Sequence, residues 1–238
     1  MKIKLTHPLI SCLCVTDNRP DMLLKAIVNF DMQNYPNKEL VISYSQTDRK
    51  TKHLIEEILK LSELSIVKVE RASDISLGQA KNEALAYCNG DFICTWDDDD
   101  WYHYNRLSHQ FNNMQVNSKY RQASILTKVM LYDEIKNLAW ISCTYNWGCS
   151  LLCRKDLILK YPFSDEDTAE DTLLLQHLYS ERRLHVIADC AFLYLHVYHG
   201  QNTMDYFHFH YLANRSELLD QESNNWIRSL INNQVSLI

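Results

Sequence analysis

Four consecutive aspartates, Asp97 to Asp100, are the densest charge in this sequence, and they directly follow an apolar, β-prone stretch. Adjacent carboxylates repel one another, and burying even one of them costs free energy unless a cation neutralises it. Two interpretations stay open here: a solvated turn at a strand end, or a divalent-cation site. Because Mg²⁺ and Mn²⁺ prefer oxygen ligands and are often held by one or two carboxylates plus substrate phosphates, a single D-x-D is enough for such a site.

A second acidic group, Glu170 and Asp171, comes just before an apolar helical pattern. A carboxylate beside a substrate can act as a general base, which contributes about 10² to 10⁴-fold to a rate. Acidic residues also stabilise the dipole of a helix when they lie in its first turn, which is the alternative explanation. Lys81 suits either a diphosphate contact or a solvated helix surface. His199 suits either a metal ligand or a structural hydrogen bond.

The elements that would position these side chains alternate between strand and helix in the first hundred residues. Strand patterns cover residues 9–16, 39–43, 66–70 and 92–96, and helix patterns cover 22–33, 52–64 and 76–88 between them. This alternation predicts right-handed βαβ units and a mainly parallel sheet. Ligands of such open sheets bind beyond the carboxyl ends of the strands. The four aspartates follow the fourth strand at that end, which favours a cation site over a solvated turn.

The second half of the chain has a looser pattern. Helical patterns cover residues 105–115 and 171–181, strand-like runs cover 125–133 and 139–143, and a long β-prone run covers 185–199. The segment from residue 204 onward is predicted to be helical. Its basic residues are too few for an interfacial membrane helix, so docking on the domain or a homodimer contact is favoured there.

The composition is that of a folded protein of 238 residues, with 46% hydrophobic residues and a net charge of −6. No basic stripe offsets this charge, so nucleic-acid binding is not expected. The eight cysteines show neither C-x-x-C pairs nor zinc-ligand spacing, and reduced core thiols are expected. The start, MKIKLTHPLI, lacks a signal-peptide core, and no apolar run reaches the ~20 residues of a membrane span. A cytoplasmic protein is predicted, with the inner face of the membrane as the alternative location.

Four blocks of the sequence, in this order, resemble family 2 glycosyltransferases with a GT-A fold. They are PLISCLCVTDNRPDMLLKAI, LGQAKNEALAYCNGDFICTWDDDDWYHYNRL, WGCSLLCRKDLILKYPFSDEDTAEDTLLL and YHGQNT. The resemblance covers residues 8–203. A lone D-x-D is weak evidence, but one that ends a fourth strand and is followed by Glu-Asp before an apolar helix is specific.

The resemblance implies a GT-A fold of the α/β class, with a mainly parallel twisted sheet, a small antiparallel or irregular acceptor part and C-terminal helices. We expect one domain over residues 1–238. Within it, residues 1–103 would bind the nucleotide sugar, 104–203 would bind the acceptor and perform catalysis, and 204–238 would form the helical end. The implied reaction moves a sugar from a nucleotide diphosphate, expected to be UDP, to a saccharide, lipid-linked or protein-linked hydroxyl. It is metal-dependent, with Mn²⁺ or Mg²⁺, and inverts the anomeric centre.

Specific roles follow from the same resemblance. Asp99 is expected to bind the metal directly, Asp97 to lie nearer the ribose or the metal shell, and Asp98 to contact the nucleotide sugar. Asp171, beside Glu170, is expected to act as the catalytic base. His199 is expected to be a further metal or diphosphate ligand, and Lys81 a diphosphate contact.

One departure from the family affects base recognition. Most members carry an acidic sequence after the second strand, and here Ser43 and Tyr44 stand in its place. Either Asp48 or the Ser43 hydroxyl substitutes for that acid, or Thr16 and Asn18 bind the base with stacking by Tyr44. Arg19, in the same loop as Asn18, is expected to bind the nucleotide sugar as well.

Three other functions stay open. A metal-dependent nucleotidyltransferase would share the sheet and the acids, but should carry a glycine-rich phosphate loop, which TDNRPDM lacks. A non-catalytic nucleotide-sugar-binding module would bind donor and metal without turnover. A structural α/β protein with an acidic turn would bind neither.

Overall fold

Parallel βαβ units build the first half of the chain, as the alternation predicts. This computed structural model describes residues 7–117 and 120–233. The elements are β1 (Ile10–Thr16), α1 (Pro20–Asp31), β2 (Lys38–Ser45), α2 (Arg49–Leu61), β3 (Ile66–Arg71), α3 (Leu77–Leu85) and β4 (Phe92–Thr95). Strand β1 pairs in parallel with both β2 and β4, and β2 pairs in parallel with β3. The last residues of these strands therefore meet at one edge of the sheet, where the four aspartates begin.

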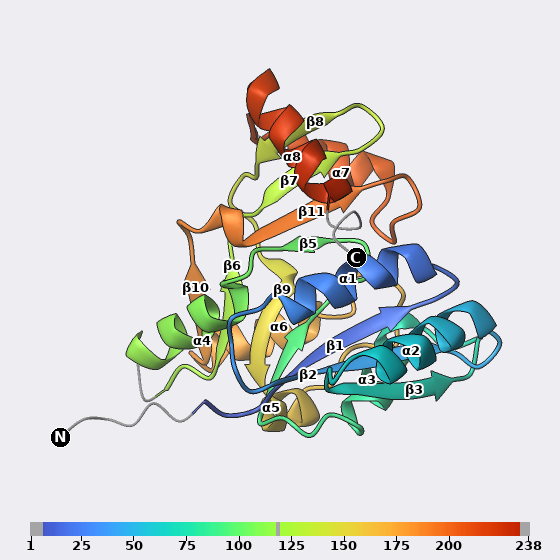
Figure 1. The fold of residues 1–238 in the computed structure, drawn as a ribbon. Helices are drawn as coiled ribbons and strands as arrows, with labels where there is room; N and C mark the ends of the chain where they lie inside the picture. Colours follow the sequence, from blue (N-terminus) through green and yellow to red (C-terminus); the bar gives the residue numbers. More distant parts are fainter. Residues whose placement is uncertain (1–6, 118–119, 234–238) are drawn as a thin grey trace.

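The second half completes this sheet and adds another. Its elements are β5 (Trp101–Tyr102), α4 (Arg106–Asn117), β6 (Ala123–Leu126), β7 (Met130–Asp133), β8 (Leu138–Ile141), β9 (Trp147–Arg154), α5 (Lys155–Lys160), α6 (Thr172–Ser180), β10 (Leu184–Ile187), a 3₁₀ turn η1 (Ala191–Leu193), β11 (Tyr194–Tyr198), α7 (Tyr206–Ala213), β12 (Glu217–Leu218) and α8 (Gln221–Asn233). The first sheet has the order β10-β6-β9-β4-β1-β2-β3, in which β9 is antiparallel to both of its neighbours. The second has the order β12-β8-β7-β11-β5 and lies above the first in Figure 1, with α7 and α8 beside it.

The structure differs from three of the sequence predictions in this half of the chain. The strand-like run 125–133 contributes β6 to one sheet and β7 to the other, because the chain crosses between them at residues 127–129. The run 185–199 is broken by η1 into β10 and β11, again in different sheets. The C-terminal segment is not wholly helical, since β12 pairs with β8. Residues 234–238 of that segment lie outside the described residues.

Both faces of the first sheet are covered, which explains why its strands read as continuous apolar runs. Along β1, Cys12 and Cys14 face one core cluster and Leu13 faces the other. The first cluster includes residues of α1, α2 and α4, and the second includes residues of α3, α5 and α6. This three-layer packing fixes the direction of β4. All eight cysteines are free thiols; five are buried, as expected of core thiols, whereas Cys143, Cys149 and Cys190 are only partly buried.

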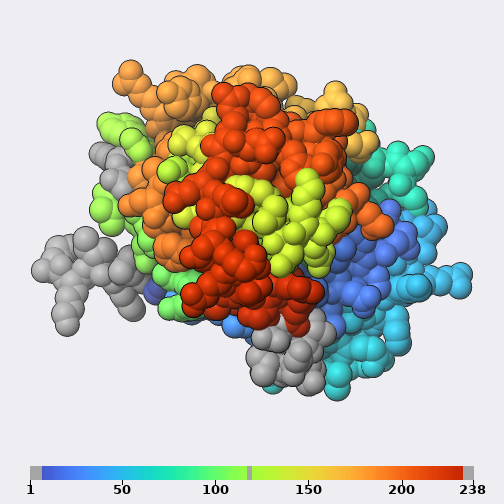
Figure 2. All heavy atoms as spheres, turned by 90° about the horizontal axis from the view of Figure 1, so that it is seen from above, coloured from blue at the N-terminus to red at the C-terminus, as the bar shows by residue number. Residues whose placement is uncertain are grey.

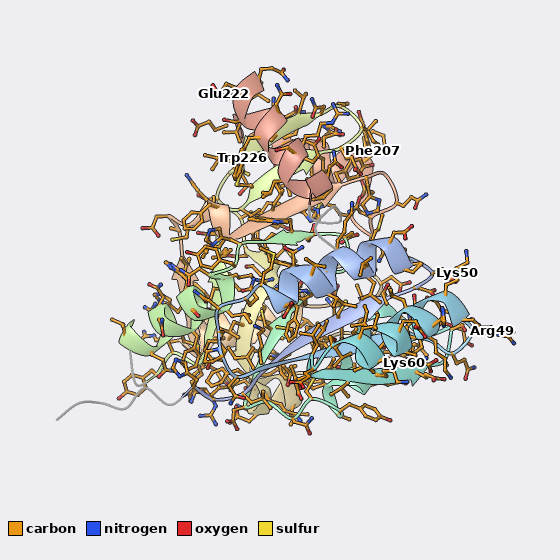
Figure 3. All side chains as sticks on the ribbon, viewed as in Figure 1. Arg49, Lys50, Lys60, Phe207, Glu222 and Trp226 are labelled. Carbon is orange, nitrogen blue, oxygen red and sulfur yellow. The ribbon has the colours of Figure 1, made fainter. Side chains whose placement is uncertain are left out.

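Short polar residues begin the helices that carry the site. The Asp48 carboxylate accepts from the Thr51 N–H at the start of α2, and the Ser76 hydroxyl accepts from the Gln79 N–H at the start of α3. Seen from above, the orange-red C-terminal segments and the yellow-green β7–β8 region cover the upper part of the molecule (Figure 2). Arg49, Lys50 and Lys60 lie on α2, in the lower right of the view (Figure 3). Within the described residues, no helix combines the length and apolarity needed to cross a membrane.

Candidate active site

The four aspartates lie directly after β4, and they bind different parts of the fold. Asp98 contacts the end of β1 and the connection that follows it. The Thr16 hydroxyl donates to the Asp98 carboxylate at 2.5 Å, and the Arg19 guanidinium lies 2.9 Å from that carboxylate. Arg19 also contacts Asp99, at 3.1 Å. Asp98 is 2% exposed, so Arg19 supplies the compensating charge that its burial requires.

Asp99 meets the segment that follows β11. His199 Nε2 lies 3.1 Å from its Oδ2, and Asn202 Nδ2 lies 3.4 Å from the same oxygen. The Asn202 side chain in turn accepts from the His199 backbone N–H and donates to the Val197 carbonyl. Two sequence-predicted residues separated by 100 positions, Asp99 and His199, are thus brought together.

Asp100 has a structural position that the sequence does not reveal. Its carboxylate accepts from the Tyr194 hydroxyl and from the Val197 backbone N–H at 2.8 Å, and His196 Nδ1 lies 3.0 Å away. Although burial opposes the charge, Asp100 raises the pKa of His196 to about 9. Asp100 therefore ties the acidic turn to β11. The Tyr194 hydroxyl also reaches Asp97, at 3.3 Å.

Arg106 lies beneath the acidic turn and was not singled out from the sequence. It is fully buried, and its guanidinium carbon lies 4.5 Å from the Tyr102 ring centroid and 4.9 Å from that of Tyr194. Its Nη2 donates to the Thr95 carbonyl at 3.0 Å and to the Cys149 carbonyl at 3.4 Å. Arg106 thus links the end of β4 to β9. The only available sequence signal was its place early in the helix after the aspartates.

Lys81 joins the two acidic motifs. Its Nζ lies 2.5 Å from the Glu170 carboxylate, and both side chains are nearly buried. Although burial opposes the charge, Glu170 and then Asp97 raise the pKa of Lys81 above its usual value. Lys81 is not the solvated helix lysine that was one of its two interpretations, because it is only 5% exposed.

The segment before Glu170 is docked on the start of α3. The Asp165 carboxylate accepts from the Ser76 hydroxyl and from the Gln79 amide, each at 2.7 Å. Gly78 permits this approach, because a Cβ there would overlap the Ser164 carbonyl. Ala169, immediately before Glu170, adopts a left-handed conformation with φ of 57°. Such strain in a non-glycine residue persists only where surrounding contacts hold it, as they do here.

Asp171 lies against the backbone of β9. A Cβ at Gly148 would overlap the Asp171 carboxylate, so glycine provides the space in which this side chain fits. Burial and then the charge of Glu170 raise the pKa of Asp171 to about 6, with Lys81 opposing the shift. Asp171 precedes α6, but its side chain makes no capping hydrogen bond there. Asp171 is nevertheless the N-cap residue of α6, where a negative charge complements the helix dipole, so the helix-start explanation stays open beside the catalytic one.

The residues expected around the base are arranged differently from the prediction. Ser43 and Tyr44 are both fully buried, and the Tyr44 hydroxyl donates to Glu70 at 3.3 Å. Neither side chain is presented to a ligand, because the layers that cover β2 enclose its end. Asp48 caps α2 and also accepts from the Asn18 backbone N–H at 2.7 Å. Asn18 itself is exposed, in a left-handed conformation with φ of 53°.

The carboxylates differ in protonation behaviour. Burial and the neighbouring Asp99 charge raise the pKa of Asp98 to about 7, and burial raises that of Asp97 to about 6. Asp99 is the opposite case, since the His199 hydrogen bond and the Arg19 charge outweigh burial and hold its pKa below the usual value. Of Asp97, Asp98 and Asp99, Asp99 is thus the carboxylate that stays ionised most easily, as a metal ligand must.

The side chains around the acidic turn offer few ligands to a divalent ion. Among the described residues, no three or more His, Cys, Asp or Glu side chains form a metal-binding group. Asp99 and His199 nevertheless converge at 3.1 Å and offer a carboxylate and an imidazole. Such a pair fits Mn²⁺ or Mg²⁺ when substrate phosphates supply the other ligands.

Comparison with known proteins places this geometry in context. The sequence profile described as Glycosyl transferase family 2 matches residues 11–157. S. aureus TarS 1-349 in complex with UDP-GlcNAc is similar in structure, with 18% identity and a TM-score of 0.65 over 95% of this chain and 66% of that one. The mannosyltransferase PcManGT from Pyrobaculum calidifontis, in complex with GDP-Man and Mn²⁺, shows 15% identity and a TM-score of 0.62 over 82% of this chain and 57% of that one.

Glucosyl-3-phosphoglycerate synthase from Mycobacterium tuberculosis, in complex with Mn²⁺, UDP and phosphoglyceric acid, is similar at 13% identity and a TM-score of 0.55, over 76% of this chain and 68% of that one. At these identities the likeness shows a shared fold, the GT-A fold. The chain spans 60% of TarS 1-349 in one solved structure of that protein and 66% in the one with UDP-GlcNAc, and it spans 57% of the mannosyltransferase. No curated protein matches the sequence.

Proposed function

This chain belongs to glycosyl transferase family 2, and from that premise we propose that it moves a sugar from a UDP-sugar to an acceptor hydroxyl, with inversion and with a divalent metal ion. One observation carries the proposal. Lys81 pairs with Glu170 at 2.5 Å and, by its effect on their pKa values, lies within electrostatic reach of Asp97 and Asp171. Two acidic motifs that are far apart in the sequence thus share one buried lysine. A solvated acidic turn would not require this arrangement.

The nucleotide part of the donor would lie over the carboxyl ends of β1 and β4. In this proposal Thr16, at the end of β1, and Asn18 and Arg19, in the connection that follows, form one side of the donor site, and Asp97 and Asp98, just after β4, form the other. Support for UDP comes from TarS and the synthase, whose structures contain UDP-GlcNAc and UDP. The enclosed Ser43 and Tyr44 would support the strand end from beneath, and the exposed loop residues would contact the base.

Asp99 and His199, with Asp97 nearby, would hold the metal ion. When bound, a divalent ion stabilises the negative charge that develops on a diphosphate leaving group. Arg19 already pairs with Asp98 and Asp99, so it is placed to contact the diphosphate from the other side. Lys81 would add positive charge on the side of the acidic turn where Asp97 lies.

Asp171 would act as the general base. As the acceptor oxygen attacks the anomeric carbon, Asp171 takes the hydroxyl proton, a new C–O bond forms and the bond to the diphosphate breaks. The electron pair of that bond leaves with the nucleotide diphosphate. Attack from the face opposite the leaving group inverts the anomeric centre. Glu170 and Lys81 would orient Asp171 beside Gly148, so that the proton acceptor is in place before the reaction.

Calorimetric titration with UDP, GDP, CDP and dTDP, with and without Mn²⁺, tests the donor site. We expect UDP to bind only with Mn²⁺, and Asp99→Ala to abolish binding. Asp91→Ala is the matched control, because Asp91 is an exposed aspartate at the opposite end of β4 and should leave binding intact. If no nucleotide binds, or if Asp99→Ala binds like the wild type, the proposed donor site is wrong.

A further inference from the structure

Tyr145, in the connection between β8 and β9, is a half-exposed aromatic residue close to the proposed base. Its side chain is 41% exposed, whereas the neighbouring Trp147 is 2% exposed and belongs to the core. Gly148, against which the Asp171 carboxylate lies, follows three residues later. Tyr145 meets the core through an edge-on contact with Trp147, yet much of its side chain stays exposed close to the proposed base, and this position calls for a functional explanation.

Contacts on both sides hold Tyr145 in place. Its backbone N–H donates to the Thr127 carbonyl at 3.0 Å. Its ring lies edge-on to Trp147, with centroids 5.4 Å apart, and edge-on to His208 of α7, at 6.2 Å. The Cys143 N–H donates to Ser216 Oγ at 2.8 Å, which anchors the same connection behind α7. The ring is therefore presented at a defined place rather than on a free loop.

Asp171 and Tyr145 are also electrostatic neighbours. Burial and then the negative charge of Asp171 raise the pKa of the Tyr145 hydroxyl. Two more exposed aromatic side chains of this part of the molecule lie on its outer surface instead. Phe207 on α7 and Trp226 on α8, 82% and 58% exposed, project outward from the upper part of the molecule (Figure 3).

We infer that Tyr145, with His208 at its edge, is the platform on which a pyranose ring of the acceptor stacks, so that the acceptor is a saccharide rather than an acyclic alcohol. This inference rests on the proposed function and names the substrate class of the same site. One face of a pyranose is lined by C–H groups and packs on an aromatic ring, while its hydroxyls stay free at the rim. A ring stacked on Tyr145 would direct a rim hydroxyl toward Asp171.

The test follows nucleotide release from a UDP-sugar with defined acceptors. The ring acceptors are the methyl pyranosides of glucose, galactose, mannose and N-acetylglucosamine, and the acyclic acceptor is glycerol. With the wild type, we expect at least one methyl pyranoside to be used better than glycerol at equal concentration. Tyr145→Ala should reduce that advantage by about tenfold, without changing UDP-sugar hydrolysis or transfer to glycerol.

Two further variants separate the ring from the hydroxyl and from the general effect of losing a tyrosine. Tyr145→Phe should keep the advantage, because it keeps the ring. Tyr87→Ala, at an exposed tyrosine just beyond α3, should behave like the wild type. The inference is overturned if no pyranoside exceeds glycerol, if Tyr145→Ala keeps the advantage, or if Tyr145→Phe loses as much as Tyr145→Ala. A wild type that neither binds UDP nor hydrolyses any UDP-sugar instead overturns the proposed function, and the inference falls with it.

Discussion

Asp171 is the residue whose ionisation should control the rate, because only its charged form can accept the acceptor proton. Its pKa is raised to about 6, by burial and then by Glu170. The carboxylate is therefore ionised above pH 6 and protonated below it, so the transfer rate should fall about tenfold per pH unit on the acid side. A pH–rate profile at saturating donor should bend near pH 6 rather than near the value of about 4 for an ordinary aspartate.

Asp171→Asn is the control for this profile. It should lower the transfer rate by about 10² to 10⁴-fold, remove the bend and leave UDP binding intact. Glu166→Gln, an exposed acid of the same segment, should keep both rate and profile. A wild-type rate that is constant down to about pH 5 would contradict the assignment of Asp171.

A second prediction for a single residue concerns Gly148. In Gly148→Ala the new methyl group overlaps the Asp171 carboxylate, which must then move. A displacement of about 1 Å in a catalytic group can cost about 10²-fold in rate. We expect the transfer rate to fall by that order while UDP and Mn²⁺ still bind, as measured by activity and calorimetry on the same preparation. Equal losses of binding and rate would mean that the glycine serves the fold rather than the position of Asp171.

At the scale of elements, the site depends on the junction between β4 and β9, which Arg106 holds from beneath. Arg106→Met keeps the apolar stem but removes the guanidinium donors to the Thr95 carbonyl and to the Gln110 side-chain oxygen, while the Cys149 carbonyl keeps its bond from the Thr95 hydroxyl. The lost hydrogen bonds inside the core and the lost cation–π contacts should lower the free energy of unfolding by about 2 to 4 kcal/mol. Chemical denaturation would measure this change.

The same substitution should weaken UDP–Mn²⁺ binding at temperatures where the variant is fully folded, because the end of β4 carries the aspartates. Arg106→Lys restores a cation and one donor, so its values should fall between those of the wild type and of Arg106→Met. Nucleotide affinity equal to that of the wild type in a folded Arg106→Met would show that Arg106 stabilises the junction without positioning the acidic turn.

At the scale of the whole molecule, metal and nucleotide should stabilise the fold together. The acidic turn contacts the end of β1 through Thr16 and the segment after β11 through His199, so a ligand bound there bridges parts of both sheets. At 100 times its dissociation constant, a ligand that binds only the native state contributes about 2.7 kcal/mol. For a chain of this size we expect a rise in Tm of about 5 to 10 °C.

Differential scanning calorimetry checks this prediction. UDP with Mn²⁺ should raise Tm, UDP with EDTA should not, and Asp99→Ala should show no rise with either. An equal rise with EDTA would mean that nucleotide binds without the metal and that the acidic turn has another role.

The local pattern of the sequence was enough to predict the first sheet and the place of the acids. Alternating strand and helix patterns predicted parallel β1 to β4, and the rule for carboxyl ends then located the aspartates at the ligand edge. These features follow from residue periodicity and chain direction, which are readable over a few residues. The crossings of residues 125–133 and 185–199 between two sheets were not readable, because a strand pattern does not say which sheet a strand joins.

Contacts between distant segments set the rest of the site. Whether Lys81 is solvated or paired depends on where the segment that contains Glu170 packs. Whether the Tyr44 side chain is exposed depends on the layers that cover β2. The space beside Gly148 is likewise filled by the Asp171 carboxylate, from a residue 23 positions away in the sequence. The sequence by itself thus predicted which groups carry the chemistry, and it determined at which end of the sheet the four aspartates lie. Their burial, their pairing and their charge came from three-dimensional packing, because desolvation and short-range contacts depend on neighbours that no local pattern specifies.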